Sequence, residues 1–219
     1  MYNLVIKDIL VIKKQFVFAF AYILLIIFAF QNMGEAKFAA GIVAFTYMLV
    51  MTSCAYEDKN KADVMLNCLP LKKSTVVLAK YISVFLYFVL GTAAYLIFQY
   101  IIGSMGFSIE IYPLTLQSFV GGLVAVSLLS GIYLPVFFKV GYMKTKILNF
   151  ILFFGFFFGI SFLIDILKDY QGSALLKNIT EFLQNKSDAV IAAVILALVF
   201  IFLSISYYIS LKFYKNREF

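Results

Sequence analysis

The sequence predicts an all-α membrane protein with six transmembrane helices. Of its 219 residues, 64% are hydrophobic and 13% are charged, whereas soluble globular domains are about 45–50% apolar and about 25% charged. Six apolar stretches approach the roughly 20 residues that a helix needs to cross the hydrocarbon core of a bilayer. The net charge of +7 would indicate a nucleic-acid partner in a soluble protein. In a membrane protein the distribution of lysine explains it, and we expect no nucleic-acid partner.

The six expected spans cover residues 16–33, 38–55, 81–102, 117–138, 147–164 and 189–211. The apolar part of the first, FVFAFAYILLIIFAF, is also as long as the core of a signal peptide. Its long apolar leading segment, and the lack of a convincing cleavage site, favour a transmembrane span. In the fourth stretch Pro135 is expected to kink the helix near its cytoplasmic end, because proline removes a backbone donor.

The positions of lysine and arginine predict the orientation of these spans. With the N-terminus in the cytoplasm, 14 of the 18 basic residues fall on the inner side and 4 on the outer side. The acidic residues divide almost evenly, with 5 inside and 6 outside. We therefore expect a multi-pass protein of the bacterial cell membrane with both termini in the cytoplasm.

The segment before the first span, MYNLVIKDILVIKKQF, has the pattern of an amphipathic helix. Its polar face holds Asn3, Lys7 and Lys14, with Asp8 and Gln15 beside it, and its apolar residues include Leu4, Ile9, Ile12 and Phe16. Such a helix would lie in the membrane interface. The alternative is that the segment forms the leading turn of the first span.

Charged residues are absent from the spans except at their edges. Ion-coupled and proton-coupled transporters usually carry intramembrane ionisable groups, and hydrolases need catalytic pairs. The chain has no histidine, and Cys54 and Cys68 form no cluster, so neither a metal site nor an enzyme activity is expected.

The fifth span contains a GxxxG pair, Gly155 and Gly159, in the stretch FGFFFG. Small residues four apart allow two membrane helices to approach closely. The pair is a candidate for the contact between two subunits of a dimer. Packing within one chain is the alternative.

The charged segment between the second and third spans has the pattern of a short helix. Apolar residues follow one helical face, and Pro70 is expected to end the helix. A second helix is expected to begin near Lys72 and to continue into the third span. The apolar face consists of Ala62, Met65, Leu66 and Leu69, with Asp58, Lys59, Lys61 and Asp63 near its start. This arrangement favours docking into a groove of a soluble partner, and a solvated loop is the alternative.

The stretch LNCLPLKKSTVVLAKYIS resembles the segment after the second span in small permease subunits of ABC-2 type exporters. Leu69-Pro70 and Lys80-Tyr81 match the pattern of that family. The family's helix-capping serine is replaced by Lys72, and Ser74 is the expected substitute. The resemblance implies a single ABC-2 type transmembrane domain over residues 1–219. It also implies an amphipathic extracellular helix at residues 173–184, between the last two spans.

The resemblance further implies that the short helix is a coupling helix that docks a separate ABC ATPase subunit. The residues assigned to this docking role are Glu57, Asp58, Lys59, Lys61, Ala62, Met65, Leu66 and Leu69. The chain has no GxxxxGK[ST] loop, so ATP and Mg²⁺ are expected on the partner and no cofactor on this chain. A second permease subunit, identical or paralogous, would complete the transporter.

The expected function is that of the permease subunit of an ATP-driven exporter. The similar family includes exporters of peptides and phenol-soluble modulins and proteins that confer resistance to antibiotics. An amphiphilic substrate is therefore expected: a hydrophobic or amphipathic peptide, a peptide antibiotic or a lipid-like molecule. One alternative is a membrane adaptor that docks a cytoplasmic partner without transport. An ion channel or secondary transporter is the other.

Overall fold

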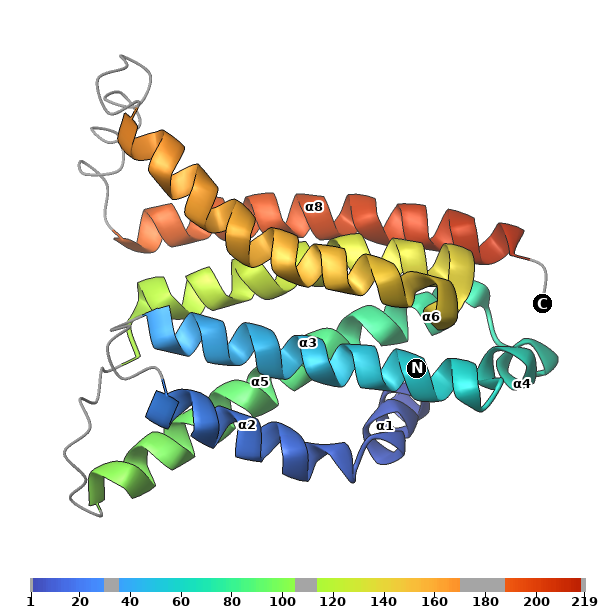
Figure 1. Ribbon diagram of the computed structural model, residues 1–219. Coiled ribbons are helices and arrows are strands. Elements are labelled where there is room, and N and C mark those ends of the chain that lie inside the picture. Colours follow the sequence, from blue (N-terminus) through green and yellow to red (C-terminus); the bar gives the residue numbers. More distant parts are fainter. Residues whose placement is uncertain (1, 30–35, 105–113, 170–187, 218–219) are drawn as a thin grey trace.

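The computed structural model describes residues 2–29, 36–104, 114–169 and 188–217, and these residues form helices and no strand. The helices are α1 (Tyr2–Val11), α2 (Gln15–Ala29), α3 (Ala36–Lys59), α4 (Ala62–Cys68), α5 (Lys73–Ser104), α6 (Leu116–Asp169) and α8 (Asp188–Asn216). Figure 1 shows the long helices running along an elongated bundle, with the short helices α1 and α4 toward one end. The predicted all-α class is confirmed for this part of the chain. The predicted extracellular helix at 173–184 lies outside the described residues.

Four of the described helices are long and apolar enough to cross a membrane, and five if α1 and α2 are counted together as one broken span. These four are Lys37–Lys59, Lys73–Ser104, Leu116–Leu152 and Asp188–Asn216. The multi-pass character expected from the sequence is therefore confirmed. The count of six is not confirmed, because α2 is described over 15 residues only and the fifth expected span continues the same helix, α6, as the fourth.

The N-terminal segment forms a separate helix and is not the leading turn of the first span. A turn at residues 12–14 separates α1 from α2, and the two helices are bent by 72°. The face that α1 buries includes Val5 and Asp8, followed by Ile12 in the turn. Asn3 and Lys14 of the expected polar face are exposed, whereas Asp8, expected beside that face, points into the protein, where it has charged partners.

Helix α6 folds back on itself at Gly141. The backbone there has φ 77° and ψ 173°, a conformation that is essentially restricted to glycine. Tyr133 lies before this break and Asn149 after it, yet both contact Tyr47 of α3: the Tyr47 and Tyr133 ring centroids are 5.9 Å apart, and the Tyr47 hydroxyl donates to Asn149 Oδ1 over 3.0 Å. In a straight helix two residues 16 positions apart would be separated by about 24 Å. We call the parts before and after Gly141 the first and second arms.

The break in α6 falls at Gly141, a position that no sequence pattern selected, and the kink expected at Pro135 stays a prediction. Pro135 lies inside the first arm, and Gly141 is the position of α6 where the backbone angles leave the helical range. Figure 1 shows the second arm running back along the bundle. The start of α6 is fixed by Thr115, whose Oγ1 accepts a hydrogen bond from the Ser118 backbone N–H at 3.2 Å.

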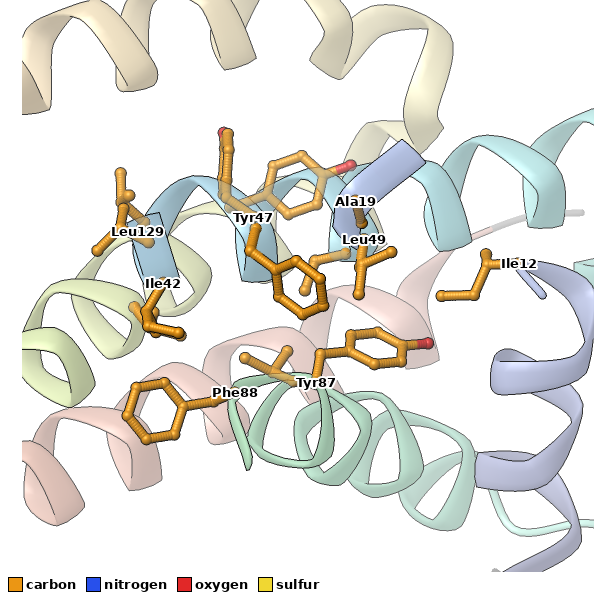
Figure 2. Packing of buried hydrophobic residues seen from close by; sticks show 14 of the residues in the cluster. Ile12, Ala19, Ile42, Tyr47, Leu49, Tyr87, Phe88 and Leu129 are labelled. Atoms are coloured by element: carbon orange, nitrogen blue, oxygen red, sulfur yellow. The ribbon is translucent and has the colours of Figure 1, made fainter. Parts of the chain in front are cut away.

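Helix α3 lies at the centre of the bundle, packed against α1, α2, α5 and α6. Figure 2 shows Ile42 and Leu49 of this helix on the side that faces the rings of Phe88 and Tyr87 from α5. In the most apolar window of α3, 67% of the residues are buried, against 22% in α8. Because α8 combines the highest hydropathy with the least burial, its outer face is suited to contact lipid.

Hydroxyl groups join three of the long helices inside the bundle. The Tyr81 hydroxyl of α5 lies 2.6 Å from Ser206 Oγ and 2.8 Å from Ser210 Oγ of α8. Ser206 Oγ in turn donates to the backbone oxygen of Gly131 in α6 over 2.6 Å. Such contacts average roughly 0.6 kcal/mol between membrane helices. They fix the relative rotation of α5, α6 and α8 more than they stabilise the fold.

We predict that Gly141→Ala destabilises the protein by about 1–3 kcal/mol, because a Cβ carbon is strained at this backbone conformation. The new carbon would also lie 3.0 Å from Arg217 Nη2. The matched control is Gly121→Ala, at a helical position where an added Cβ meets nothing within 4 Å among the described residues. Thermal unfolding of the purified protein measures both variants. Equal midpoint temperatures of unfolding for Gly141→Ala and Gly121→Ala would contradict the role assigned to Gly141.

Candidate functional site

The short helix α4 lies at the end of the bundle where several chain segments meet. Helix α3 leads into it through Asn60 and Lys61, and four residues, 69–72, separate its end from the start of α5. Lys61 has a positive φ of 48°, which allows the sharp change of direction after α3. Leu69 is extended, as expected before a proline, so the prediction that Pro70 ends this helix is confirmed. Figure 1 shows α4 at the tip of the bundle, near the C-terminal end of α8.

The predicted boundaries of this segment need a correction at both helix starts. Helix α3 continues through Glu57 and Asp58 to Lys59, so α4 begins only at Ala62. Glu57, Asp58 and Lys59 had been expected at the start of the coupling helix. In α5 the backbone N–H of Thr75 donates to the Lys72 carbonyl over 2.9 Å, and Ser74 lies inside the helix, so Ser74 is not its N-cap.

The predicted docking face of α4 is divided between the surface and the interior. Met65 is 70% exposed and Leu69 is 51% exposed, whereas Leu66 is only 7% exposed. Ala62 is half-buried. Val64, which the sequence analysis did not select, is 50% exposed and adds to the outer surface. The i, i+3, i+4 pattern identified a helix but did not distinguish its supporting residue, Leu66, from its surface residues.

The charged residues assigned to docking are divided in the same way. Lys59 and Lys61 are exposed, as is Lys72 on the other side of α4. Asp58 is half-buried, and its Oδ1 lies next to Gly141. Glu57 is 7% exposed and faces the interior. The accessible charge around α4 is therefore positive, and the acidic residues at its start face other parts of the chain.

The C-terminal end of α8 holds α4 from one side. Arg217 Nη1 lies 3.2 Å from Asp63 Oδ2. Burial raises the pKa of the Asp63 carboxyl above its usual value, the nearby Glu57 carboxylate adds to this effect, and the Arg217 guanidinium opposes it. Lys73 of α5 donates to the backbone oxygen of Lys215 over 3.3 Å, at the negative end of the α8 dipole. These contacts fix α4 and the start of α5 against the end of α8.

A buried ionic cluster lies behind α4, where α1, α3 and α5 meet. Lys80 Nζ of α5 lies 2.6 Å from Glu57 Oε2 of α3 and 3.4 Å from Asp8 Oδ2 of α1. Lys7 Nζ lies 3.2 Å from both Glu57 Oε1 and Asp8 Oδ1. Asp8, Glu57 and Lys80 are 4%, 7% and 5% exposed. The two carboxylates and two ammonium groups have no net charge, which reduces the cost of burying them.

Two serines complete the hydrogen bonding of this cluster. Lys80 Nζ donates to Ser53 Oγ over 2.9 Å, and Ser83 Oγ donates to Asp8 Oδ2 over 3.1 Å. The sequence analysis did not identify the cluster. A signal was present, because Asp8, Glu57 and Lys80 each lie at the edge of an apolar segment, where an unpaired charge would be costly. The sequence offered no means of deciding which of these charges pair.

The predicted dimer residues Gly155 and Gly159 lie on the second arm of α6. A Cβ added at either position meets nothing within 4 Å among the described residues. Phe154 and Phe158 on the same arm are 51% and 71% exposed. Over the part of the chain that the structure describes, the two glycines therefore do not mediate packing within the chain.

A cavity of about 440 Å³ opens between α2, α3 and the second arm of α6. Small-molecule sites usually measure about 300–1,000 Å³ and are mostly apolar with a few polar groups. The cavity between α2, α3 and the second arm is likewise mostly apolar with a few polar groups. Its lining consists of Tyr22, Ala44, Tyr47, Met48, Met51, Thr52, Ala55, Tyr142, Asn149, Phe150 and Phe154.

We predict that Lys80→Met destabilises the protein by about 3–5 kcal/mol, because it leaves carboxylates buried without their main partner. Lys72→Met, which removes an exposed lysine from the same region of the chain, is the matched control and should change stability by less than about 0.5 kcal/mol. Thermal unfolding in detergent compares the two. If Lys80→Met unfolded at the temperature of the control, the cluster would contribute nothing to the stability of the fold.

Comparison with known proteins agrees with this architecture. A family model described as ABC-2 family transporter protein matches residues 3–215. Searches of curated proteins and of solved structures found no match. The family match includes every described helix almost completely, from α1 to α8. The chain therefore belongs to the ABC-2 family of membrane transporter proteins.

Proposed function

We propose that the chain is the permease subunit of an ATP-driven exporter in a bacterial cell membrane. A separate ABC ATPase subunit binds ATP and Mg²⁺ and docks on α4. The observation that carries this proposal is the short helix with an exposed apolar surface at the end of a bundle whose sequence matches an ABC-2 family over residues 3–215. This chain supplies the membrane path and is not itself an enzyme.

The proposed docking surface consists of the outer side of α4 and the lysines around it. Val64, Met65 and Leu69 are exposed apolar residues, and Lys59 and Lys61 are exposed next to them. A partner with an apolar groove and acidic residues at its rim would complement this surface. Leu66 and Glu57 support the surface from behind and do not touch the partner.

We further propose six spans, with both termini and α4 in the cytoplasm. Two ion pairs support this arrangement, because Lys7 of α1 contacts Glu57 and Arg217 contacts Asp63. The two ends of the chain therefore lie at the same end of the bundle as α4. The lysine distribution assigns that end to the cytoplasm. The fold-back at Gly141 supports two spans within α6, the fourth as its first arm and the fifth as its second arm.

The proposed substrate is amphiphilic: a hydrophobic or amphipathic peptide, a peptide antibiotic or a lipid-like molecule. The cavity of about 440 Å³ supports this class, because its lining is apolar apart from tyrosine, threonine and asparagine side chains. It lies between helices that would be in the membrane, so an amphiphile that partitions into the bilayer would have access to it.

A membrane adaptor that docks a cytoplasmic partner without transport is the alternative, since the exposed surface of α4 suits either role. The two functions differ in ATP hydrolysis. A mild-detergent pull-down of the tagged chain from its native cells, followed by identification of the bound proteins, is the first test. Recovery of an ATPase whose activity the chain stimulates supports the permease. A partner without this response supports the adaptor.

We predict that Met65→Glu lowers the affinity for the ATPase by about 100-fold or more, because an unpaired carboxylate in a desolvated contact costs about 3 kcal/mol or more. The side chain is 70% exposed, so the fold should be retained. Met143→Glu is the matched control, since Met143 is 76% exposed but belongs to α6. Pull-down with purified ATPase measures both. Unchanged binding of Met65→Glu would remove α4 from the docking surface.

We predict that Gly155→Leu weakens association of two permease subunits by about 1–3 kcal/mol, because the added side chain overpacks a close helix contact. The variant should fold normally, since space is open around Gly155 within the described chain. Gly121→Leu, at a similarly open position on the first arm, is the control. Crosslinking in the membrane reports association. A normal dimer for Gly155→Leu would place the subunit contact elsewhere.

A further inference from the structure

The buried ionic cluster lies at the base of the hairpin that carries α4. Glu57 is near the end of α3, two residues before its last residue, and Lys80 is in the third turn of α5. These two helices are the ones that enter and leave α4. The Glu57–Lys80 contact of 2.6 Å therefore closes the hairpin at its base. Asp8 of α1 also contacts Lys80, which joins α1 to the base of the hairpin. Lys7 of α1 contacts Asp8 as well.

The connection from α3 to α4 is short and hydrogen-bonded. The Asn60 backbone N–H donates to the Tyr56 carbonyl over 3.0 Å, and the Lys61 N–H donates to the Asp58 carbonyl over 3.1 Å. On the other side the Leu69 N–H donates to the Leu66 carbonyl over 3.3 Å. Leu66 is buried against the bundle. A force applied to α4 is therefore transmitted directly to the end of α3, whereas residues 69–72 connect α4 to α5 outside either helix.

Stability alone does not account for the use of four charges at this position. Well-packed apolar side chains of similar volume stabilise a protein interior as well as a buried ion pair does, and often better. The charges define the orientation and register of the three helices. Lys80 contacts both carboxylates only when α1, α3 and α5 are correctly placed. Ser53 and Ser83 restrict the geometry further through their hydrogen bonds to Lys80 and Asp8.

We infer that this cluster makes α1 and the α3–α5 hairpin one rigid unit, with Lys80 as the positioning residue. This inference rests on the proposed docking of an ATPase on α4. When the ATPase displaces α4, the cluster carries the displacement to α1. Helix α1 joins α2 at a 72° bend, so the movement reaches a helix that lines the cavity between α2, α3 and the second arm of α6.

The first arm of the test uses the permease alone. Cys68 on α4 is exposed and Cys54 is buried, so a spin label reacts with Cys68 in the natural sequence. A second label is placed on α1 at Leu10→Cys, a position that is 58% exposed. In lipid nanodiscs we expect one narrow distance distribution between the two labels by pulsed electron paramagnetic resonance. A broad distribution would overturn the inference without any reference to the ATPase.

The second arm adds the ATPase with and without nucleotide. In the wild-type background the distance between the labels on α1 and α4 should stay the same in both states, because the two helices move together. A change in that distance would overturn the inference. If the wild-type chain recruits no ATPase, the proposed function fails, while the narrow distribution in the permease alone still supports the rigid unit.

The third arm replaces the charges with apolar residues: Asp8→Leu, Glu57→Leu and Lys80→Met together. This triple variant leaves only Lys7 without its carboxylate partners, and the Lys7 side chain is 32% exposed, so no fully buried charge is left unpaired. Lys80→Arg is the charge-retaining control. We expect the triple variant to bind the ATPase and hydrolyse ATP while transport of a fluorescent amphipathic peptide per ATP falls about fivefold or more, the lower range of coupling between sites. Lys80→Arg should retain coupling.

The outcomes of this arm separate a structural role from a positioning role. If the triple variant transported the peptide with wild-type efficiency per ATP, the cluster would contribute only to folding and the inference would be overturned. If the triple variant does not fold, the distance between the labels on α1 and α4 in the wild-type background decides the question. It should be the same with and without nucleotide, and that measurement needs no change in the cluster.

Discussion

The ammonium group of Lys80 is the contact on which the arrangement of the α4 end depends. It reaches a carboxylate of α3, a carboxylate of α1 and a hydroxyl of α3, all within 3.4 Å. A buried charge tolerates few alternatives, since each displaced partner leaves another charge uncompensated in a medium of low dielectric constant. The contacts of Lys80 therefore define the register of α1, α3 and α5 at this end of the bundle. Because α4 is connected to α3 and α5, its position depends on that register.

The all-helical class and the approximate positions of the membrane helices could be predicted, because a bilayer requires long apolar segments whose backbone is hydrogen-bonded internally. The end of α4 at Pro70 was equally accessible, since proline restricts the residue before it. These features depend on local composition and need no knowledge of tertiary contacts. The same local rules predicted a kink at Pro135 but did not identify the break at Gly141. Proline within a helix need not break it, whereas the conformation at Gly141 does.

The division of the site could not be predicted because it depends on which helices are neighbours. Periodicity assigned Leu66 and Met65 to one face, but only the position of the bundle determines that Leu66 is covered and Met65 exposed. Glu57, Asp58 and Lys59 were assigned to docking from the family resemblance, and the pairing of Glu57 with Lys80 removes Glu57 from the surface. Asp8 and Arg217 belong to the site through contacts with residues far away in the sequence, Lys80 and Asp63.

The turn at Gly141 has a consequence for the mechanics of the whole bundle. Two arms joined by one residue have no connecting loop, so neither can change its axial position without carrying the other. The turn also touches Asp58 and Arg217, which lie at the ends of α3 and α8. A displacement of one helical residue, about 1.5 Å, at this turn would therefore reappear at the far ends of both arms. The hydrogen bond from Tyr47 to Asn149 also joins the second arm to α3, so α3 would be drawn into the same displacement.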